Sequence, residues 1–339
     1  MQQRPRIGIT LGDPAGIGPE IVLRALQDPE IYRDAVPVLF GNPRVVRRAL
    51  TVLGSDAELR LVASAADAAG TPGVLDLVAT CDDTPPPWGQ VSASGGREAG
   101  QAITAAVGAV QAGTVDGLNT APLNKEALRL GGYAYPGHTE MLADLFESSG
   151  VYTLFVTGSL YIFFLTRHHP LRTVPGLLSV ETVYAGIVRC LTFLNELGFA
   201  DSHLAVAALN PHAGEHGLLG SEEQTILEPA VARAQAEGYA VSGPVPADAV
   251  FYQAREGRFT GVLSLYHDQG HIAAKTLDFY GTVSVTLGLP VIRTSVDHGT
   301  AFDIAGRGIA DARGQVAALR AAARLTRQQQ AARRDPPEP

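Results

Sequence analysis

The sequence predicts an α/β protein of two lobes, each an α/β/α sandwich built on a mainly parallel sheet. Short apolar runs rich in β-branched residues alternate with longer Ala- and Leu-rich stretches, which is the pattern of βαβ units. The chain has 339 residues, more than one hydrophobic core usually serves. Hydrophobic residues make up 46% and charged residues 18% of the chain, as is typical of a globular enzyme.

Five short apolar runs are predicted to be strands. Each is rich in β-branched or aromatic residues and runs into a turn that contains Gly, Pro, Asn, Asp or His. They cover residues 6–11, 36–40, 161–165, 203–209 and 261–266.

Five stretches with helical patterning are predicted to be helices. The first opens with a proline, and the second and third are followed by Gly113 and Gly198, the residue type that most often terminates a helix. The five helices cover residues 19–26, 97–112, 180–197, 222–237 and 315–328.

Composition and charge argue against several classes of protein. The formal net charge of −8, without a basic stripe, disfavours nucleic acid as a partner. No apolar run in the sequence reaches the roughly 20 residues that a membrane-spanning helix needs. Cys81 and Cys190 are the only cysteines and no apolar leader opens the sequence, so we expect a cytoplasmic protein without a disulfide framework.

Histidines gather just after three of the predicted strands. Ligands of parallel sheets bind outside the carboxyl ends of the strands, so imidazoles far apart in sequence can converge there. Three imidazoles suit zinc or another first-row divalent ion and leave coordination positions open for a substrate. One such histidine alone more often makes a loop hydrogen bond, but the repeated placement favours a metal site. The spacing leaves open which member of each pair is the ligand; the candidates are His168 or His169, His212, and His267 or His271.

A glycine-rich turn at residues 12–18 links the first strand to the first helix. It could let a ligand approach the backbone or serve as a tight connection, and both interpretations are equally supported. Its spacing is not that of the G-x-G-x-x-G fingerprint, and the sequence has no G-x-x-x-x-G-K-[ST] motif. Neither a Rossmann nor a P-loop nucleotide site is therefore predicted.

Two cations and two carboxylates lie near the presumed cleft in the sequence. Lys275 and Arg293 are in loop-like stretches, so we expect them to bind phosphate or carboxylate groups rather than to support the fold. Asp248 and Asp268 could orient a metal ligand or move a proton. Solvated surface cations and turn caps are the alternative interpretations.

Six motifs stand out along the sequence: GDPAGIGPE at 12–20, TAPLNK at 120–125, GHTE at 137–140, NPHAG at 210–214, YHDQG at 266–270 and DHGTA at 297–301. With these motifs the sequence resembles the 4-hydroxythreonine-4-phosphate dehydrogenase family from about residue 6 to about residue 325. The resemblance implies a fold similar to those of isocitrate and isopropylmalate dehydrogenases. We expect a first lobe of residues 1–127 and 286–330 on the nucleotide side, a second lobe of residues 128–285 with the histidines, and a cleft between them.

The resemblance also implies roles for individual residues. The metal ligands of the family fall on His168, His212 and His267, which chooses within each histidine pair. The substrate contacts fall on His138, Thr139, Lys275 and Arg293, and on Ser284, where the family usually has asparagine. NAD is expected near residues 287–301, with contacts at Gly288, Asp297, His298, Gly299 and Thr300. The general base is not assigned, and the candidates for catalytic proton transfer are Asp248, Asp268 and Lys275.

By the same resemblance, the chain is expected to oxidise and decarboxylate a 4-phosphorylated 3-hydroxy acid with NAD and one divalent ion, either Zn, Mg, Mn or Co. The first candidate reaction converts 4-phosphooxy-L-threonine to 2-amino-3-oxo-4-phosphooxybutanoate, a step of pyridoxal phosphate (pyridoxine, vitamin B6) biosynthesis. The alternative is oxidation of 4-phospho-D-threonate or 4-phosphoerythronate, to which the stretches at 135–138 and 269–271 look closer. The resemblance further implies a homodimer in which the partner subunit completes each cleft.

Two other classes of function use similar residues. A cleft with three histidines and several aspartates could hydrolyse a phosphate ester, and a sensor of metal and nucleotide could keep the same pockets without catalysis. Release of phosphate or binding without turnover would separate these classes from a dehydrogenase, which produces NADH.

Overall fold

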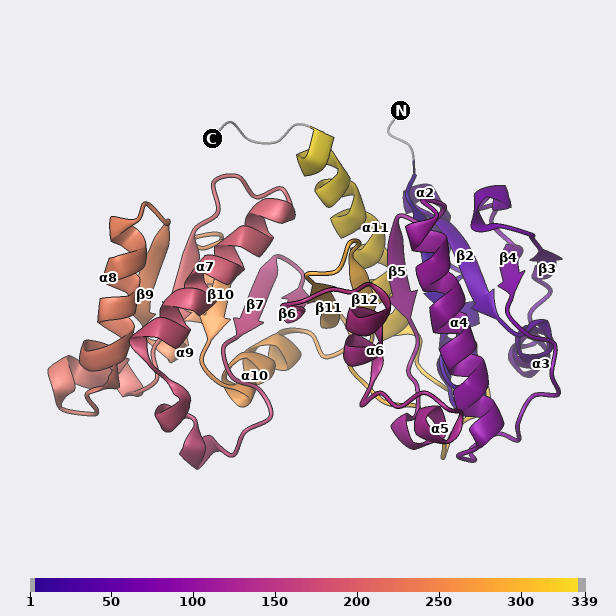
Figure 1. Cartoon of the computed structure of the whole chain (residues 1–339), viewed down its shortest axis with the longest axis horizontal. Coiled ribbons are helices and arrows are strands. Elements are labelled where there is room, and N and C mark those ends of the chain that lie inside the picture. The colour runs from indigo at the N-terminus through magenta and orange to yellow at the C-terminus, as the bar shows by residue number, and fades with distance from the viewer. Residues whose placement is uncertain (1–3, 335–339) are drawn as a thin grey trace. The chain divides into compact units, whose positions relative to one another are not determined.

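The computed structural model describes residues 4–334 (Figure 1). The chain forms two compact units. Among the described residues, the first comprises residues 4–152 together with Val283–Arg327, and the second comprises Thr153–Thr282 and residues 328–334. The first crossing between units therefore falls later in the chain than the 127/128 boundary expected from the sequence, while the return lies close to the expected 285/286.

The sheet of the first unit has the strand order β3-β4-β2-β1-β5-β12-β11. Its neighbouring strands are parallel, apart from the antiparallel pair β11 and β12. The strands are β1 (Arg6–Thr10), β2 (Val36–Gly41), β3 (Glu58–Leu61), β4 (Val74–Ala79), β5 (Gly117–Thr120), β11 (Val283–Leu287) and β12 (Arg293–Ser295).

Helices cover both faces of this sheet. Ile7 and Ile9 of β1 pack with α1, α3 and α11, whereas Val38 and Phe40 of β2 pack with α4, α5 and α6. Alternate residues of a strand point to opposite faces, so two fully buried strands supply two cores. The helices are α1 (Gly18–Ala25), α2 (Pro29–Asp34), α3 (Pro43–Leu53), α4 (Ala93–Gln111), α5 (Lys125–Leu130), α6 (His138–Leu145) and α11 (Arg313–Arg334).

The second unit repeats this arrangement around the strand order β6-β7-β10-β8-β9. The pair β6 and β7 is antiparallel and the other pairs are parallel. Ile162 and Val262 pack with α9 and α10, while Leu263 lies against Gly186 of α7 on the other face. The elements are β6 (Tyr152–Thr157), β7 (Leu160–Phe164), α7 (Val180–Glu196), β8 (Leu204–Ala207), α8 (Glu228–Ala236), β9 (Val241–Val245), α9 (Ala247–Arg255), β10 (Gly261–Ser264) and α10 (His267–Leu277).

The predicted fold class is confirmed, and the five predicted strands and five predicted helices are present with shifted ends. Helix α4 begins at Ala93, four residues before the predicted start, because the Ser92 hydroxyl caps it by accepting from Gly95 N. Gly113 and Gly198 have positive φ angles of 70° and 88° just beyond α4 and α7, as predicted. The predicted helix 222–237 is a π-helical turn, Glu223–Leu227, followed by α8.

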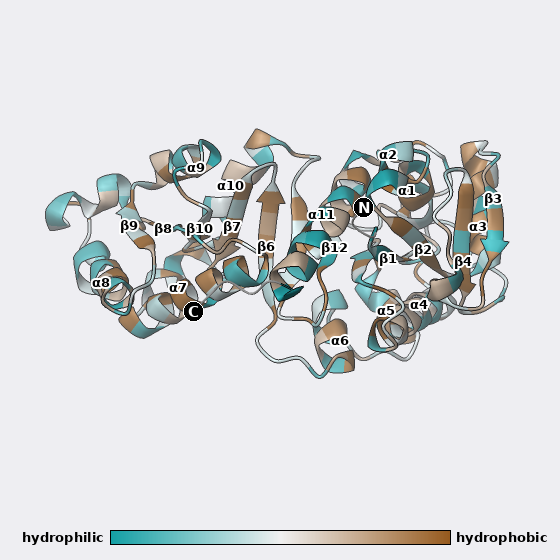
Figure 2. Cartoon of the chain, turned by 90° about the horizontal axis from the view of Figure 1, so that it is seen from above, coloured by the Kyte–Doolittle hydropathy of each residue, from teal (hydrophilic) through white to brown (hydrophobic). Residues whose placement is uncertain are grey.

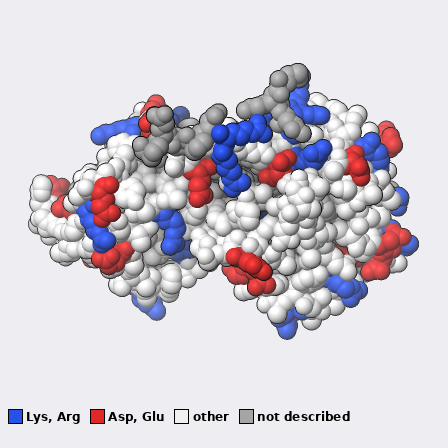
Figure 3. Space-filling model, turned by 45° about the horizontal axis from the view of Figure 1, so that its top comes forward, with Lys and Arg blue, Asp and Glu red and all other residues white. Residues whose placement is uncertain are grey.

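The surface pattern agrees with two buried sheets. Figure 2 shows hydrophobic strands between helices whose hydrophilic residues alternate with hydrophobic ones. On the face in Figure 3, acidic and basic side chains are interspersed among uncharged atoms. Within residues 4–334, none of the helices has the length and apolar character needed to cross a membrane.

Candidate functional site

Three neighbouring strands of the second unit bring the predicted histidines to one edge of its sheet. Strand β10 pairs in parallel with β7 on one side and β8 on the other, so the three carboxyl ends lie at the same edge. His168 follows the end of β7, His212 follows β8, and His267 is the first residue of α10 after β10. The edge is where ligands of parallel sheets bind.

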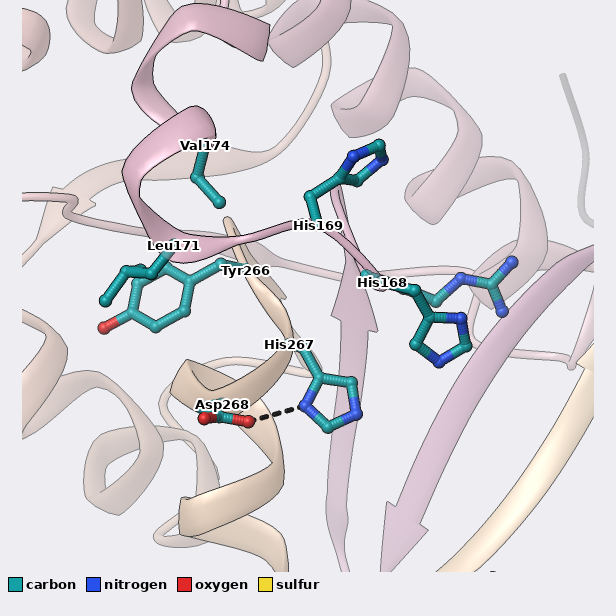
Figure 4. A pocket seen from close by; sticks show the side chains of 8 residues that line it. His168, His169, Leu171, Val174, Tyr266, His267 and Asp268 are labelled. Atoms are coloured by element: carbon teal, nitrogen blue, oxygen red, sulfur yellow. Dashed lines mark hydrogen bonds and ion pairs between the residues drawn. The ribbon is translucent and has the colours of Figure 1, made fainter.

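A pocket of about 300 Å³ opens at this edge. The ring centroids of His168 and His267 lie 5.8 Å apart beside it, and His169 points away from His267 (Figure 4). This geometry favours His168 over His169 as the member of the first pair that acts with His267. The pocket is lined by Arg167, His168, His169, Leu171, Val174, Tyr266, His267 and Asp268.

Asp268 sets the orientation and the tautomer of His267. Its Oδ1 lies 2.6 Å from Nδ1 of His267 (Figure 4), and a carboxylate can only accept, so Nδ1 carries the proton. In this tautomer the lone pair of the ring is on Nε2. A carboxylate behind a histidine in this way is the usual support of a metal-binding imidazole.

The second member of the other pair, His271, lies one helical turn after His267 on α10. The two rings are stacked, with centroids 3.6 Å apart and an angle of 10° between their planes. Nδ1 of His271 donates to the backbone carbonyl of His267 at 2.7 Å. The two imidazoles therefore contact each other through their faces rather than converging through their nitrogen atoms.

His212 lies in a turn of unusual conformation. Residues 212–216 all have positive φ angles, between 45° and 79°, and each non-glycine residue there costs about 1–2 kcal/mol relative to a right-handed turn. The buried carboxylate of Glu223 holds the start of this turn by accepting from Leu209 N and Asn210 N at 2.9 and 2.7 Å. Over residues 4–334, no three His, Cys, Asp or Glu side chains are close enough to form a metal cluster, so His212 is at the same sheet edge without joining the other two.

The two other candidates for proton transfer lie on helices of the second unit. Asp248 is exposed in the first turn of α9, which packs against the turn containing His212. Lys275 is half-buried on α10, with Nζ 5.4 Å from the centre of the Phe279 ring. The prediction that Lys275 lies in a loop is wrong, because the helix that starts at His267 continues to Leu277.

Arg293 occupies a buried polar position in the first unit. It is the first residue of β12 and only 5% exposed, so the prediction of a loop-like stretch is wrong here too. Its Nε donates to Oγ1 of Thr120 at 3.0 Å, and Nη1 donates to Oγ1 of Thr286 at 3.1 Å. Burial lowers the pKa of the guanidinium to about 10, partly offset by Glu140, so it remains a cation at neutral pH.

His138 and Thr139 open helix α6 in the same unit. Nε2 of His138 is buried and has no hydrogen-bond partner among the described residues. Burial, and then the charge of Arg293, hold the pKa of His138 well below its usual value, so the ring is neutral. A buried cation beside an unsatisfied imidazole nitrogen is suited to an anionic or hydroxylated ligand.

Ser284 lies on the same face of the sheet as the Arg293 side chain. Thr286 and Arg293 are cross-strand partners in the β11–β12 pair, and Ser284 is two residues before Thr286 on β11. Residues two apart on a strand share a face, as do cross-strand partners. The side chain of Ser284 therefore points toward the polar side that Arg293 occupies, and it is half-buried.

The predicted cofactor segment follows β12. Asp297, His298 and Gly299 are exposed, and the carbonyl of Thr300 accepts from Ile17 N at 3.0 Å. The fold itself favours glycine at position 288, because the φ angle there is 82° and an added Cβ would lie 3.1 Å from Gly150 O.

The glycine turn at 12–18 is a tight connection. Its residues are buried, and an added Cβ at Gly12 or Gly16 would lie within 3 Å of Pro122 O or Thr300 O. Of the two interpretations of this turn, the structure supports the packing role rather than a ligand loop.

Sequence reasoning missed the residues that hold the candidate ones in place. Thr120 and Thr286 position Arg293, and Glu223 positions the turn of His212. Thr120 is the first residue of the TAPLNK motif and the last residue of β5, so the motif could have indicated a polar side chain at a strand end. Glu223 lies 14 and 13 residues after the two backbone amides that it holds, with no regular spacing that links them, so only the fold reveals the contact.

Comparison with known proteins gives consistent matches over nearly the whole chain. Residues 33–322 match the family described as pyridoxal phosphate biosynthetic protein PdxA. A protein of Symbiobacterium thermophilum with the provisional name D-threonate 4-phosphate dehydrogenase is 50% identical over 326 residues, which cover 96% of this chain and 97% of that protein.

Two crystal structures of proteins titled 4-hydroxythreonine-4-phosphate dehydrogenase are also similar. The Klebsiella pneumoniae protein has a TM-score of 0.88 and 40% identity, covering 96% of this chain and 98% of its own. The Burkholderia phymatum protein has a TM-score of 0.86 and 41% identity, covering 96% of this chain and 99% of its own.

Proposed function

Because this chain belongs to the pyridoxal phosphate biosynthetic protein PdxA family, we propose that it is an NAD-dependent, divalent-metal-assisted dehydrogenase of a 4-phosphorylated 3-hydroxy acid. The family match confirms the resemblance indicated by the six sequence motifs. The chain is an oxidoreductase, since its relatives and structural neighbours are dehydrogenases. The cofactor, the metal and the substrate are what the proposal adds.

The observation that carries the proposal is the arrangement of His168, His267 and Asp268 at the carboxyl edge of β7 and β10. The rings lie side by side, and Asp268 leaves the Nε2 lone pair of His267 available, so the donor chemistry fits a divalent ion. We propose His168, His212 and His267 as its ligands; His212 lies at the same sheet edge but apart from the other two, so the turn that carries it would have to bring its ring to the ion. A bound ion would supply Lewis acidity that lowers the pKa of the substrate hydroxyl.

The first unit supplies the anion-recognising residues of the proposed site. Arg293 keeps its charge in a buried environment, where Coulomb attraction to a phosphate or carboxylate is stronger than in water. His138 is neutral and presents an unsatisfied nitrogen, and Thr139 adds a hydroxyl beside it. Lys275 of the second unit is the further cation assigned to the substrate.

We propose that one of three residues transfers the proton of the substrate hydroxyl. Asp248, Asp268 and Lys275 remain the candidates, and Asp268 is already engaged with His267. NAD would accept the hydride, and residues 297–300 are assigned to it because they are exposed or half-exposed after β12.

Of the two candidate substrates, 4-phospho-D-threonate is the better supported. The relative named for D-threonate 4-phosphate is 50% identical, and those titled for 4-hydroxythreonine-4-phosphate are 40% and 41% identical. We therefore propose that 4-phospho-D-threonate is oxidised at least as well as 4-phosphooxy-L-threonine. This reverses the order of the two reactions expected from the sequence.

We also propose that the enzyme acts as a homodimer. Large apolar side chains are exposed on the second unit, including Leu218 at 79%, Ile272 at 65% and Phe279 at 63%. Ile272 and Phe279 lie on α10 and two residues beyond its end, and a contiguous apolar patch marks an interaction site more often than scattered single side chains do. Sedimentation of the purified chain at micromolar concentration tests the dimer.

An assay with NAD and each divalent ion tests the proposed function. Purified enzyme is incubated with 4-phospho-D-threonate or 4-phosphooxy-L-threonine, and NADH absorbance and free phosphate are followed together. NADH formation supports the dehydrogenase. Phosphate release without NADH would instead favour the hydrolase, and binding without turnover the sensor. Alanine variants of His168, His212 and His267 should lose bound metal, and unchanged metal content in all three would refute the ligand assignment.

A further inference from the structure

The imidazole of His271 covers one face of the His267 ring. We infer that His271 is a positioning residue, which fixes the plane of the His267 imidazole so that Nε2 keeps its direction toward a divalent cation. The inference rests on the proposed function, because that function makes His267 a ligand. Its own evidence is the stacking of the two rings at 3.6 Å and 10°.

His271 itself is poorly placed to be a second ligand on α10. Two histidines one turn apart can share an ion when their nitrogen atoms converge on it. Lone pairs of imidazole lie in the ring plane, and stacked planes direct them alongside each other rather than toward one point. Nδ1 of His271 is also committed to the carbonyl of His267.

His271 is held firmly enough to act as a support. Its Nδ1 proton is fixed by the 2.7 Å bond to His267 O. Its ring centroid lies 4.3 Å from that of Phe155 and 4.6 Å from that of Phe164, two buried residues of the sheet. A ring that is packed from the sheet side can in turn restrict the ring stacked on its other face.

Two contacts then restrict the two rotations of the His267 side chain. The bond from Nδ1 to Asp268 fixes the ring edge, and the face of His271 limits tilting of the ring plane. Either contact alone leaves one motion free. Together they keep the Nε2 lone pair oriented before any ion arrives, which reduces the ordering required on binding.

The test compares cobalt binding by metal-free wild-type enzyme and by His271→Ala and His271→Phe. Co²⁺ is titrated while its visible absorption and the binding heat are measured, and each melting temperature is recorded. We expect His271→Ala to bind Co²⁺ about tenfold more weakly, a typical effect of losing such a supporting residue. His271→Phe keeps a flat ring at this position and should stay within about threefold of wild type.

His203→Ala is the matched control. His203 is another half-buried histidine of the second unit, with its ring 5.2 Å from that of Phe259 and Nε2 bonded to Ser242, but it lies just before β8 at the opposite edge. It should leave Co²⁺ affinity unchanged.

The outcomes separate this inference from the proposed function. If His267→Ala abolishes Co²⁺ binding while His271→Ala binds like wild type, the inference fails and the metal site stands. A His271→Phe variant as weak as His271→Ala would also overturn it, because the flat ring would not be what matters. If His267→Ala binds Co²⁺ normally, the proposed metal site fails and this inference with it.

Discussion

The guanidinium of Arg293 and the hydroxyl of Thr120 are joined across the neighbouring strands β12 and β5, with Nε of Arg293 3.0 Å from Oγ1 of Thr120. Both residues are buried. Thr120 thus fixes the direction of a charge that water does not screen, so the same hydrogen bond connects the stability of the first unit with the anion binding that we propose for Arg293.

Replacing Arg293 with lysine should reduce both activity and stability. Lysine keeps the charge but cannot span Thr120 and Thr286, and lost hydrogen bonds to a charged group cost about 1.5–3 kcal/mol each. We expect kcat/KM to fall by about 10–100-fold, mainly through KM, with a melting temperature several degrees lower. Thr286→Val is the control: it should lower the melting temperature with a smaller effect on KM. A lysine variant with wild-type KM would contradict a role in substrate binding.

Asp268→Asn should weaken metal binding, whereas Asp248→Asn should not. An asparagine amide at 268 no longer presents a carboxylate to Nδ1 of His267, and loss of such a partner costs about 10–100-fold in metal affinity. Competition with a chromophoric chelator measures the affinity. If Asp248→Asn instead abolishes turnover while metal affinity is retained, Asp248 is the favoured general base. Equal metal affinity in both variants and wild type would show that the His267–Asp268 contact is not used.

Ser284→Asn should change the choice between the two substrates. Serine is short and leaves space for water or a different C2 substituent, whereas asparagine brings two donors and an acceptor closer. We expect the ratio of kcat/KM for 4-phospho-D-threonate over 4-phosphooxy-L-threonine to fall severalfold. Ser284→Ala, which keeps the space, should stay near the wild-type ratio. An unchanged ratio in the asparagine variant would remove residue 284 from substrate selection.

Glu98→Gln should stabilise the protein at pH 8 and not at pH 5. Glu98 on α4 is 5% exposed, and burial raises its pKa to about 7 although its Oε2 accepts from Asn42. A raised pKa means that folding favours the protonated carboxyl, so its contribution to stability is lost as pH rises from about 4.5 through 7. At roughly 1.4 kcal/mol per pKa unit, the loss at pH 8 is at most about 3–4 kcal/mol.

Melting temperatures at the two pH values test this prediction. The exposed residue Glu126 on α5 provides the control variant Glu126→Gln, which should behave like wild type. A gain of equal size at pH 5 and pH 8 would mean that the charge of Glu98 is not the cause.

NAD should be preferred over NADP by at least about tenfold in kcat/KM. A 2′-phosphate needs exposed cations, and within residues 293–310 Arg293 is buried against threonines, which leaves Arg307. Steady-state rates with both cofactors at saturating substrate measure the preference. Comparable efficiencies would indicate a phosphate pocket built from residues elsewhere in the chain.

The features that could be predicted from sequence depend on local patterns. Apolar runs followed by histidine placed His168, His212 and His267 at strand ends, and β7, β10 and β8 indeed lie side by side. The ends of two helices could also be predicted from glycines, since Gly113 and Gly198 adopt the positive φ angles expected of residues that terminate a helix.

The features that sequence could not provide depend on long-range packing. Arg293 follows a Gly-Leu-Pro turn, and this pattern predicts a loop. Pairing of β12 with β5 and β11 instead makes Arg293 a buried strand residue. His267 reads as part of a turn, yet it begins α10. The stacking of His267 and His271, with an angle of 10° between their rings, is likewise a feature that no spacing encodes.

The discontinuous first unit has a consequence for biosynthesis. Strands β11 and β12 belong to its sheet, but the ribosome makes them only after the whole segment Thr153–Thr282. Domains generally begin to fold as they emerge, so the second unit, with its histidines, can become compact while β5 still lacks its neighbour β12. The nascent chain then acquires Arg293 late, and the buried polar position around it forms only after the strand-end histidines of the second unit can be in place.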